Sequence, residues 1–362
     1  MTVRSIHQFV VGFDYGDAIS NFTLELQSVI RDMGYRSEIY GKYISPEVRN
    51  KAHFYTEYDK ESSSSNVVIF HFSIGSSVSQ YFRSLKDRKV IVYHNITPAE
   101  FFDEFDSYVA ASLREGRKEL LELRDVVSLA VGVSMYDCRE LEDHGFENVW
   151  YLPLVLNVED KERGFDKGTV EQYSDGKINV LFVGRVVPNK KVEDLIKVFY
   201  FYKKYLNPRS RLIVVGGTGM WNKYYAFLQK LIDALHLKDV VFTEKVKDSE
   251  LVGYYKVADV YLSMSEHEGF GLPLLEAMHF GVPVVAYSAA AIPETVGNGG
   301  ILVDEKRYEK IAEIINEIVN NRNLHDYLVD AGRKRLMEFS KSRWRKRAGE
   351  LIKQIERVVD KG

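Results

Sequence analysis

Short apolar runs rich in β-branched residues alternate with longer stretches of helical periodicity along the whole chain. This alternation predicts a parallel α/β architecture. In the first half, the expected strands cover residues 6–11, 38–40, 67–72, 89–93 and 127–133. The clearest expected helix covers residues 18–33, because its apolar residues are spaced by three and four and form a single stripe.

A second series of the same kind follows. Its expected strands cover residues 178–183, 212–215, 240–242, 257–262, 284–286 and 301–303. Its expected helices cover residues 192–205, 221–235, 272–279 and 311–320. Between the two series, residues 157–177 are rich in charged residues and glycine, and this change in composition predicts a linker. Two α/β domains are therefore expected, and open sheets of this kind bind ligands at the carboxyl ends of their strands.

Length and composition support this picture and exclude several classes of protein. The 362 residues exceed the roughly 100–200 usual for one domain, and 45% hydrophobic residues exclude a disordered chain. A net charge of −3 gives no reason to expect nucleic acid as a partner. The single cysteine, Cys138, excludes internal disulfides and multi-cysteine zinc sites. Without a signal-peptide pattern or a long apolar stretch, a soluble cytoplasmic protein is expected.

The most informative stretch reads SEHEGFGLPLLEAM from position 265. It follows an expected strand and opens an expected helix, with Pro273 near the first helical position. Gly269 and Gly271 allow the backbone to approach a ligand closely, and the start of the helix offers unpaired N–H groups to an anion. Glu268 and Glu276 flank this turn, where carboxylates suit the hydroxyl groups of a sugar and a ribose joined to that anion. An ordinary turn with exposed glutamates is the alternative, which the glycines, the proline and the strand context disfavour.

A basic loop, GRVVPNKK, follows the strand expected at 178–183. Its Arg185 and Lys190 are expected at the same carboxyl edge of the sheet, where they can bind a diphosphate and stabilise the charge that develops as it leaves. A solvated basic loop is the alternative, and it would be favoured for this loop alone. The phosphate-binding turn predicted beside it favours the functional interpretation.

Two further turns follow expected strands. The turn GGTG at 216–219 is not a dinucleotide fingerprint, because Asn222 stands where G-x-G-x-x-G requires its last glycine. We expect Gly217 and Thr218 to line a phosphate or a sugar, with a plain tight turn as the alternative. The turn at 244–248 is expected to line a nucleobase through its backbone, at Val246.

Arg185, Lys190 and the motif EGFGLPLLE at 268–276 together resemble the donor-site signature of retaining glycosyltransferases of family four. The resemblance covers most of the second half in order and spacing, including GVPVVA at 281–286. It implies the α/β GT-B fold, which has two Rossmann-like domains facing across a cleft and a C-terminal helix that crosses back to the first domain. The implied domains are residues 1–163 with the returning helix 344–362, which form the acceptor side, and residues 164–343, which bind the donor.

The resemblance also implies roles for individual residues. Glu276 would hydrogen-bond the ribose hydroxyls, and Glu268 would hold a hydroxyl of the donor sugar. Arg185 and Lys190 would neutralise the leaving diphosphate, so neither a cofactor nor a metal is expected, and no Asp-x-Asp occurs in the chain. Backbone N–H groups expected beside sugar and phosphate belong to the turn before the helix and its first residue: Phe270, Gly271 and Leu272. Where the family form often has glycine after the lysine, this chain has Lys191.

In the first half, the resemblance places His94 at the family's active-site histidine, close to the donor sugar. His71 ends the preceding strand and is expected to line the same cleft. The loop with Gly16 corresponds to a loop that approaches the donor phosphates, although the usual paired glycines are missing. Asp17 either orients an acceptor hydroxyl or caps the following helix. No histidine has metal-ligand spacing, so no metal is expected.

The resemblance predicts transfer of a hexose, glucose or mannose, from a nucleotide diphosphate sugar to a saccharide or lipid-linked acceptor, with retention of configuration. A sugar-nucleotide epimerase, a phosphorylase and a non-catalytic partner subunit of the same fold remain alternatives. Basic residues cluster between Arg333 and Arg347. They fit a solvated helix face, which we favour, or a peripheral contact with an anionic membrane or a lipid diphosphate. Trp344 is expected to pack on the first domain.

Overall fold

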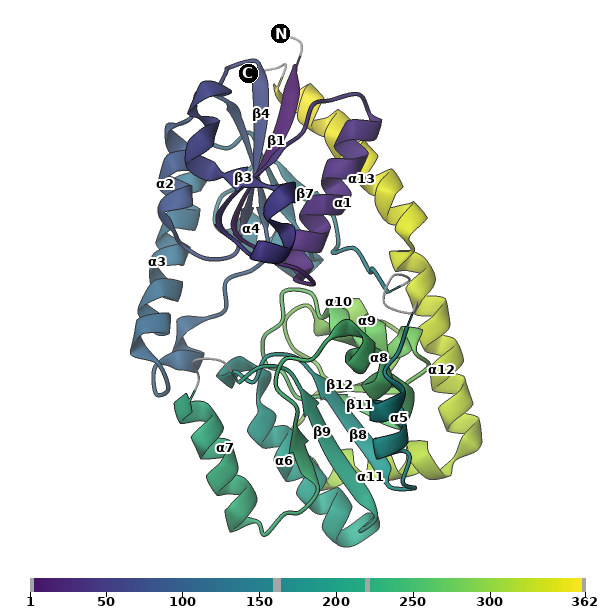
Figure 1. The fold of residues 1–362 in the computed structure, drawn as a ribbon. Coiled ribbons are helices and arrows are strands. Elements are labelled where there is room, and N and C mark those ends of the chain that lie inside the picture. Colours follow the sequence, from purple (N-terminus) through teal and green to yellow (C-terminus); the bar gives the residue numbers. More distant parts are fainter. Residues whose placement is uncertain (1–2, 159–163, 219–221, 360–362) are drawn as a thin grey trace. The chain divides into compact units, whose positions relative to one another are not determined.

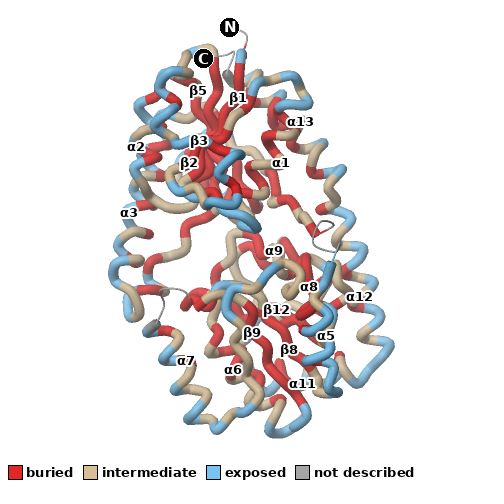
Figure 2. Tube along the Cα trace, viewed as in Figure 1, coloured by how far each residue is buried: buried red, intermediate tan, exposed pale blue. Residues whose placement is uncertain are grey.

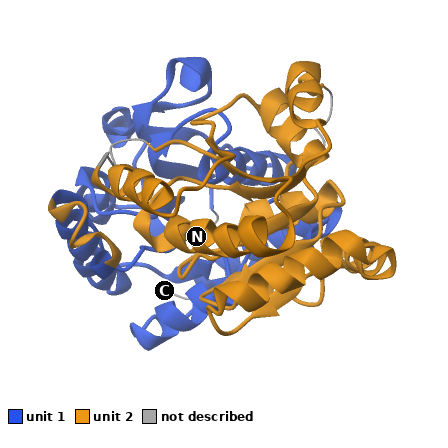
Figure 3. Cartoon of the chain, turned by 90° about the horizontal axis from the view of Figure 1, so that it is seen from below, with its two compact units in different colours: residues 1–100, 108–155, 339–362 blue, residues 101–107, 156–338 orange. Residues whose placement is uncertain are grey.

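The computed structural model describes residues 3–158, 164–218 and 222–359. The chain divides into two compact units (Figure 3). Unit 1 comprises residues 1–100, 108–155 and 339–362, and unit 2 comprises residues 101–107 and 156–338. The segment 101–107, which lies within the first domain expected from the sequence, groups with unit 2.

Unit 1 is built on a parallel sheet of seven strands in the order β3-β2-β1-β4-β5-β6-β7. Its strands are β1 (Ser5–Phe13), β2 (Ile39–Ile44), β3 (His53–Phe54), β4 (Asn66–Phe72), β5 (Arg88–Tyr93), β6 (Leu129–Gly132) and β7 (Val149–Tyr151). The sequence analysis did not predict the two edge strands, β3 and β7, because two or three residues are too few to show an alternating pattern. The central strand β4 is buried along its whole length (Figure 2).

Helices cover the sheet of unit 1 (Figure 1). They are α1 (Ala18–Asp32), α2 (Ser77–Ser84), α3 (Ser107–Arg124), α4 (Met135–Asp143) and α13 (Lys341–Val359), with 3-10 turns at Pro46–Lys51, Tyr55–Lys60 and Ala99–Phe102. The apolar stripe of α1 is buried, as its spacing predicts. Helix α1 packs against α13, which the chain reaches only after passing through unit 2.

Unit 2 is built on a parallel sheet of six strands in the order β10-β9-β8-β11-β12-β13. Its strands are β8 (Ile178–Val183), β9 (Ser210–Val215), β10 (Val240–Phe242), β11 (Val260–Ser263), β12 (Val284–Tyr287) and β13 (Ile301–Val303). The order reverses between β8 and β11, which are hydrogen-bonded neighbours although β9 and β10 separate them in sequence. Such a reversal is where open α/β sheets bind their ligands.

The helices of unit 2 are α5 (Lys167–Tyr173), α6 (Val192–Phe201), α7 (Asn222–Ala234), α8 (Asp248–Val257), α9 (Leu272–His279), α10 (Ile292–Val296), α11 (Tyr308–Asn320) and α12 (Arg322–Leu336). Short turns lie at Pro188–Lys190, Tyr202–Leu206 and Met337–Phe339. The helix expected at 192–205 ends at Phe201 and continues as a π-type turn.

The prediction of a linker over residues 157–177 is wrong for its second half, which contains α5. Asp166 caps this helix by accepting hydrogen bonds from the backbone N–H and the hydroxyl of Thr169, at 2.6 and 2.8 Å. Thr169 and Tyr173 are buried, and α5 packs against α8. The polar composition of this segment suggested a linker because a seven-residue helix with two buried side chains needs few apolar residues.

The return of the C-terminal helix to unit 1 is confirmed. Trp344 on α13 is 2% exposed, and its indole N–H donates to the carbonyl of Pro153 at 2.6 Å. Its ring meets the edge of Phe22 on α1, with the ring centres 5.4 Å apart. The expected packing of Trp344 on the first domain is therefore observed.

Two members of the basic cluster 333–347, Lys341 and Arg345, form ion pairs within unit 1. Arg345 pairs with Glu25 and Asp32 of α1, at 2.5 Å in each case, and Lys341 also reaches Glu25, at 3.2 Å. These two basic residues therefore attach α13 to α1. Within the described ranges, no helix has both the length and the apolar character to cross a membrane.

Reversing the charge at Glu25 tests this attachment. We expect Glu25→Lys to lower the free energy of unfolding by about 1 kcal/mol, because the new ammonium repels Lys341 and Arg345. Urea unfolding at low ionic strength measures the change, with Glu47→Lys, an exposed position of unit 1, as the matched control. Equal unfolding midpoints for the two variants would show that the pairs do not stabilise unit 1.

Candidate functional site

Lys190 and Glu268, two residues of the predicted signature, meet in unit 2. Lys190 ends the turn after β8, and Glu268 lies in the loop after β11. Because β8 and β11 are adjacent parallel strands, both loops leave the same edge of the sheet. The Lys190 Nζ lies 2.5 Å from the Glu268 Oε2, and these side chains are only 16% and 17% exposed. The structure thus forms a close, mostly buried ion pair from residues 78 positions apart in the chain, as the numbering shows.

Asn189 fixes the two loops to each other. Its carbonyl accepts from the backbone N–H of Glu266 at 2.9 Å, and its side-chain amide donates to the carbonyl of His267 at 3.0 Å. Asn189 is buried, so these bonds are shielded from water. The residue lies inside the basic loop GRVVPNKK, but sequence reasoning passed over it because only charged residues were considered there.

Lys191 occupies the position where the family form often has glycine, and the backbone explains that preference. Its φ of 50° and ψ of 49° lie in the left-handed region, which glycine adopts most readily. The Lys191 ammonium lies 3.4 Å from a carboxylate oxygen of Glu266 and 5.5 Å from the ring centre of Phe101. These contacts offset part of the backbone cost of a lysine at this position.

A charge cluster of buried Asp194 with the partly buried Glu266 and Lys306 lies beside the two loops. The Lys306 Nζ lies 2.7 Å from Asp194 and 2.6 Å from Glu266, and the Tyr308 hydroxyl donates to Asp194 at 2.8 Å. Burial acts to lower the pKa of Lys306, but its bonds to both carboxylates outweigh burial and raise that pKa above its usual value. Lys306 therefore stays charged and connects the loop after β11 to helix α6. Sequence reasoning missed this lysine, which no local motif marks.

Glu276, the second predicted glutamate, lies in the first turns of α9 and is buried. The helix begins at Leu272 after Gly271, whose φ of 95° is left-handed, and no side chain caps it. The hydroxyl of Tyr255, on α8, donates to the Glu276 Oε2 at 2.9 Å. Burial and the adjacent carboxylate raise the pKa of Tyr255 well above its usual value, so the hydroxyl keeps its proton. Tyr255 was also missed by the sequence analysis.

The remaining predicted residues of this region differ in their surroundings. Arg185, at the start of the loop after β8, is exposed, and within the described part of the chain its guanidinium has no ion pair. The side chain of Phe270 is buried, and its carbonyl accepts from the Thr295 hydroxyl at 2.5 Å. Gly269 and Leu272 are half-buried. The expected backbone contact of Phe270 with a ligand stays a prediction.

The loop after β9 is held against the loops after β8 and β10. The backbone N–H and the hydroxyl of Thr218 donate to the Glu244 carboxylate, at 2.9 and 2.6 Å. The hydrogen bond from the Thr218 hydroxyl has the larger effect and the one from its backbone N–H the smaller, and together they hold the pKa of Glu244 below its usual value. The Gly217 carbonyl accepts from the N–H of Val186 at 3.1 Å, and Val246 is half-buried. Gly219, the last glycine of the predicted turn, lies outside the described residues.

In unit 1, Asp17 caps α1. Its carboxylate accepts from the backbone N–H and the hydroxyl of Ser20, at 2.9 and 3.0 Å. The capping alternative is thus what the structure shows, and a role toward an acceptor stays a prediction. Gly16 is exposed with a left-handed φ of 76°, and a Cβ there would meet open space.

His94 and His71, from the ends of β5 and β4, meet in the interior of unit 1. The His71 Nδ1 lies 3.0 Å from the His94 Nε2, and the His71 Nε2 lies 2.9 Å from the Gln8 Oε1. Burial lowers the pKa of His94 to about 3 and the pKa of His71 well below its usual value. Both rings are therefore uncharged at neutral pH.

Acid should destabilise unit 1. Burial lowers the folded-state pKa to about 3 for His94 and to about 4 for His7, below the usual histidine value of 6.5. The unfolded chain therefore takes up protons at these rings near pH 6.5, and stability present above that pH is lost as the pH falls toward 3. We expect a lower urea midpoint at about pH 5 than at about pH 7.5, and a smaller difference for His7→Gln. Equal pH dependence in that variant would contradict the prediction for His7.

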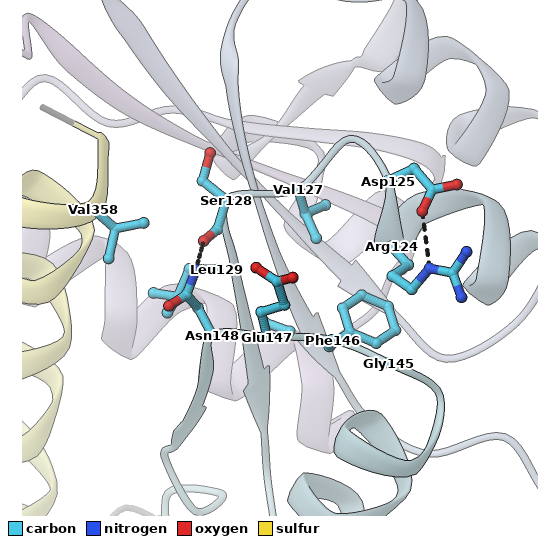
Figure 4. Close-up of a pocket in the computed structure, with 11 residues that line it drawn as sticks. Arg124, Asp125, Val127, Ser128, Leu129, Gly145, Phe146, Glu147, Asn148 and Val358 are labelled. Atoms are coloured by element: carbon cyan, nitrogen blue, oxygen red, sulfur yellow. Dashed lines mark hydrogen bonds and ion pairs between the residues drawn. The ribbon is translucent and has the colours of Figure 1, made fainter. Parts of the chain in front are cut away.

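A hollow of about 460 Å³ opens at the other edge of the sheet of unit 1, before the strands β6 and β7 (Figure 4). Its lining includes Arg124, Asp125, Phe146, Glu147 and Asn148, and Arg124 pairs with Asp125 at 2.8 Å. None of the predicted site residues lines it. Among the described residues, no three His, Cys, Asp or Glu side chains are grouped so that they could hold a metal ion.

Two parallel Rossmann-like sheets, with a last helix that returns to the first unit, form the GT-B fold of glycosyltransferases. The crystal structure of Anabaena HepE in complex with UDP and glucose matches 97% of this chain and 100% of its own, with a TM-score of 0.74 and 16% sequence identity. WaaG, a glycosyltransferase involved in lipopolysaccharide biosynthesis, matches 96% and 99%, with a TM-score of 0.70 and 14% identity. The expected fold class is confirmed.

Residues 169–335 match the family model for glycosyl transferases group 1, so the chain contains a domain of this family. An uncharacterized glycosyltransferase of Methanocaldococcus jannaschii is 31% identical over 223 residues, which cover 59% of this chain and 55% of that protein. A GDP-mannose-dependent α-(1-6)-phosphatidylinositol monomannoside mannosyltransferase of Mycobacterium tuberculosis is 29% identical over 176 residues, 46% and 43% of the two chains. The chain spans about half the length of the curated relatives it matches.

Proposed function

We propose that this protein is a retaining glycosyltransferase. It moves a hexose, glucose or mannose, from a nucleotide diphosphate sugar to a saccharide or lipid-linked acceptor, and it needs no metal at the chemical step. The observation that carries the proposal is the ion pair of Lys190 and Glu268 at the point where the strand order of unit 2 reverses. One member is suited to a phosphate and the other to a hydroxyl, which are the two groups that flank the bond to be broken.

The charges of the site address the main barrier of the reaction, which is the separation of a diphosphate anion from an oxocarbenium-like sugar. Lys190, held in place by Glu268, supplies a fixed positive charge at the leaving oxygen. Arg185, exposed at the start of the same loop, is available to the second phosphate. Because both groups are cations in the resting protein, they take over the neutralising role that a divalent metal plays elsewhere.

We propose that the Glu276 carboxylate accepts hydrogen bonds from the ribose hydroxyls of the nucleotide. Its carboxylate is buried, and the hydrogen bond from Tyr255 fixes its orientation before any ligand arrives. An acceptor that is already positioned loses little freedom on binding, so the nucleotide gains affinity. No side chain caps α9, and the backbone N–H of Leu272, its first residue, is proposed to serve the sugar and phosphate, because Pro273 has no N–H and the N–H of Leu274 donates to the Gly271 carbonyl at 3.0 Å.

Removing the Tyr255 hydroxyl tests this arrangement. We expect Tyr255→Phe to weaken nucleotide binding about tenfold, because Glu276 loses the bond that orients it. Calorimetric titration with UDP and GDP measures the effect. Tyr254→Phe, the same chemical change at the preceding residue of α8, serves as the control and should bind as the unmodified protein does. Equal affinities for both variants would remove Tyr255 from the binding site.

The relatives support both donor sugars. Several carry mannosyltransferase names, among them relatives from Escherichia coli and Mycobacterium tuberculosis, and the second is named a GDP-mannose-dependent phosphatidylinositol monomannoside mannosyltransferase. The structural neighbour from Anabaena was crystallised with UDP and glucose. UDP-glucose and GDP-mannose are therefore the first donors to test, and lipid-linked saccharides belong among the acceptors.

The deciding experiment is a panel of nucleotide sugars, scored by release of UDP or GDP with and without a chelator. We expect one donor to be turned over equally in both conditions and the anomeric proton of the product to show retained configuration. No turnover and no binding with any donor would end the transferase proposal. A requirement for metal at the chemical step would contradict the roles of Arg185 and Lys190. Donor epimerisation or phosphate-dependent release would identify one of the alternative enzymes.

A further inference from the structure

Three polar side chains form a continuous chain of hydrogen bonds across the sheet of unit 1. Gln8, His71 and His94 come from β1, from β4 and from the residue directly after β5, three neighbouring strands. Their contacts are 2.9 Å from Gln8 to His71 and 3.0 Å from His71 to His94. Gln8 and His71 are almost completely buried, so no water competes for these bonds.

The donor and the acceptor in each of these hydrogen bonds can be assigned by starting from Gln8. The side-chain amide Nε2 of Gln8 donates to the carbonyl of Thr23 at 3.0 Å, so the Gln8 oxygen faces His71. An oxygen only accepts, and the His71 Nε2 therefore carries the proton. A neutral histidine has one N–H, which leaves the His71 Nδ1 as an acceptor. The proton between the two rings then belongs to the His94 Nε2.

One ring nitrogen of the three hydrogen-bonded side chains has no partner among the described residues. The His94 Nδ1 is buried, and among the described residues it has no hydrogen-bond partner. With the proton on Nε2, Nδ1 is an uncharged acceptor. A buried acceptor without a donor is unfavourable, so a donor that reaches it is favoured. Phe22 packs its ring against the edges of both histidines, at 5.6 and 5.5 Å between ring centres, and this restricts the rings from turning to another partner.

We infer that Gln8 and His71 are positioning residues that hold His94 as its Nε2–H tautomer and reserve its Nδ1 as an acceptor for a hydroxyl group of the bound substrate. The part that concerns the substrate rests on the proposed function. The tautomer itself does not, because it is set by hydrogen bonds already present in the unliganded protein. Gln8 and His71 act through His94 and need not touch the substrate.

The tautomers are read directly from long-range ¹H–¹⁵N spectra of protein labelled at its histidines. We expect both rings to show a protonated Nε2 and an unprotonated Nδ1 without any ligand. An Nδ1–H tautomer at His94, or a charged ring at neutral pH, would overturn the proposal whether or not the protein is an active transferase. Addition of UDP-glucose or GDP-mannose should then shift the ¹⁵N resonance of the His94 Nδ1 in the direction of a hydrogen-bonded acceptor. No shift with a donor that is turned over would overturn the part that concerns the substrate.

Two variants at His71 separate positioning from packing. In His71→Gln, an oxygen can accept from His94 while the amide donates to Gln8, so the direction of the chain is preserved. We expect this variant to keep the His94 tautomer and to keep kcat/KM within about threefold. His71→Leu removes the acceptor, and we expect a mixture of His94 tautomers and a loss of kcat/KM of about tenfold or more. Equal activity in both variants with an altered tautomer in one would contradict a positioning role.

Discussion

Replacing Lys190 by alanine should lower turnover by a factor on the order of 10²–10³ while the protein remains folded. The Lys190 ammonium is the fixed charge proposed to stabilise the leaving diphosphate, and a removed contact of this kind typically costs about 2.7–4 kcal/mol of barrier. The variant leaves the Glu268 carboxylate without its partner at 2.5 Å. That loss should lower the free energy of unfolding by about 1–3 kcal/mol, too little to unfold a typical domain.

Steady-state turnover and urea unfolding of the same preparation measure the two effects. Lys310→Ala, on the exposed face of α11 in the same unit, is the matched control and should change neither. A parallel fall of activity and folded fraction in Lys190→Ala would make the side chain structural. Turnover close to that of the unmodified protein would remove Lys190 from the mechanism.

Replacing Gly216 by alanine should destabilise unit 2 by about 2–6 kcal/mol. A Cβ at this position would lie 2.0 Å from the carbonyl oxygen of Gly184, a backbone atom that cannot turn aside. The φ of 146° at Gly216 adds strain for any residue with a side chain. Relief requires the loops after β8 and β9 to separate, and these loops carry Arg185 and Thr218. We therefore expect weaker nucleotide binding in addition to the lower stability.

Gly12→Ala provides the control for this substitution. Gly12 lies in β1 of unit 1, its φ is not in the left-handed region, and a Cβ there would meet no atom within 4 Å. Thermal unfolding should leave the Gly12 variant unchanged within about 0.5 kcal/mol and lower the melting temperature of the Gly216 variant. Similar melting temperatures for the two variants would show that the loops adapt to the extra carbon.

Comparison of the expected and observed elements shows where periodicity is informative. Strands β8, β10 and β13 begin and end where the sequence analysis expects them, and α9 does too. These elements have a glycine, a proline or a change of pattern at their borders. The sequence analysis expects no helix at α5, α8, α10 or α12 and no strand at β3 or β7, and its strand at 257–262 begins inside α8, where β11 starts only at Val260. Strands β3 and β7 and helix α10 are two to five residues long, and α5 depends on one cap. The buried residues of α8 are consecutive and those of α12 are few, so neither helix shows the regular spacing by which local patterns predict an element.

The residues of the candidate site likewise fall into those that local sequence patterns identify and those that only the structure shows. Arg185, Lys190, Glu268 and Glu276 were identified from sequence because each lies in a loop or helix start directly after a strand, within two short motifs. Asn189, Tyr255 and Lys306 were not identified, although Tyr255 bonds Glu276 and the other two hold the loop after β11, which carries Glu268. Tyr255 and Lys306 lie 21 and 40 positions from the glutamates that they contact. No spacing rule connects residues across such distances.

The sequence by itself determined the class of architecture, the GT-B resemblance and the residues expected to carry the chemistry. These properties depend on local features: alternating apolar runs, glycines where the chain turns, and charges placed directly after strands. Only the tertiary structure decided which of those residues meet, which side chains orient them, and that His94 lies in contact with His71 in the interior of unit 1. Such properties depend on the distances between atoms from different strands and on burial, which removes water as a competing partner. Neither quantity is contained in the order of residues along a single segment.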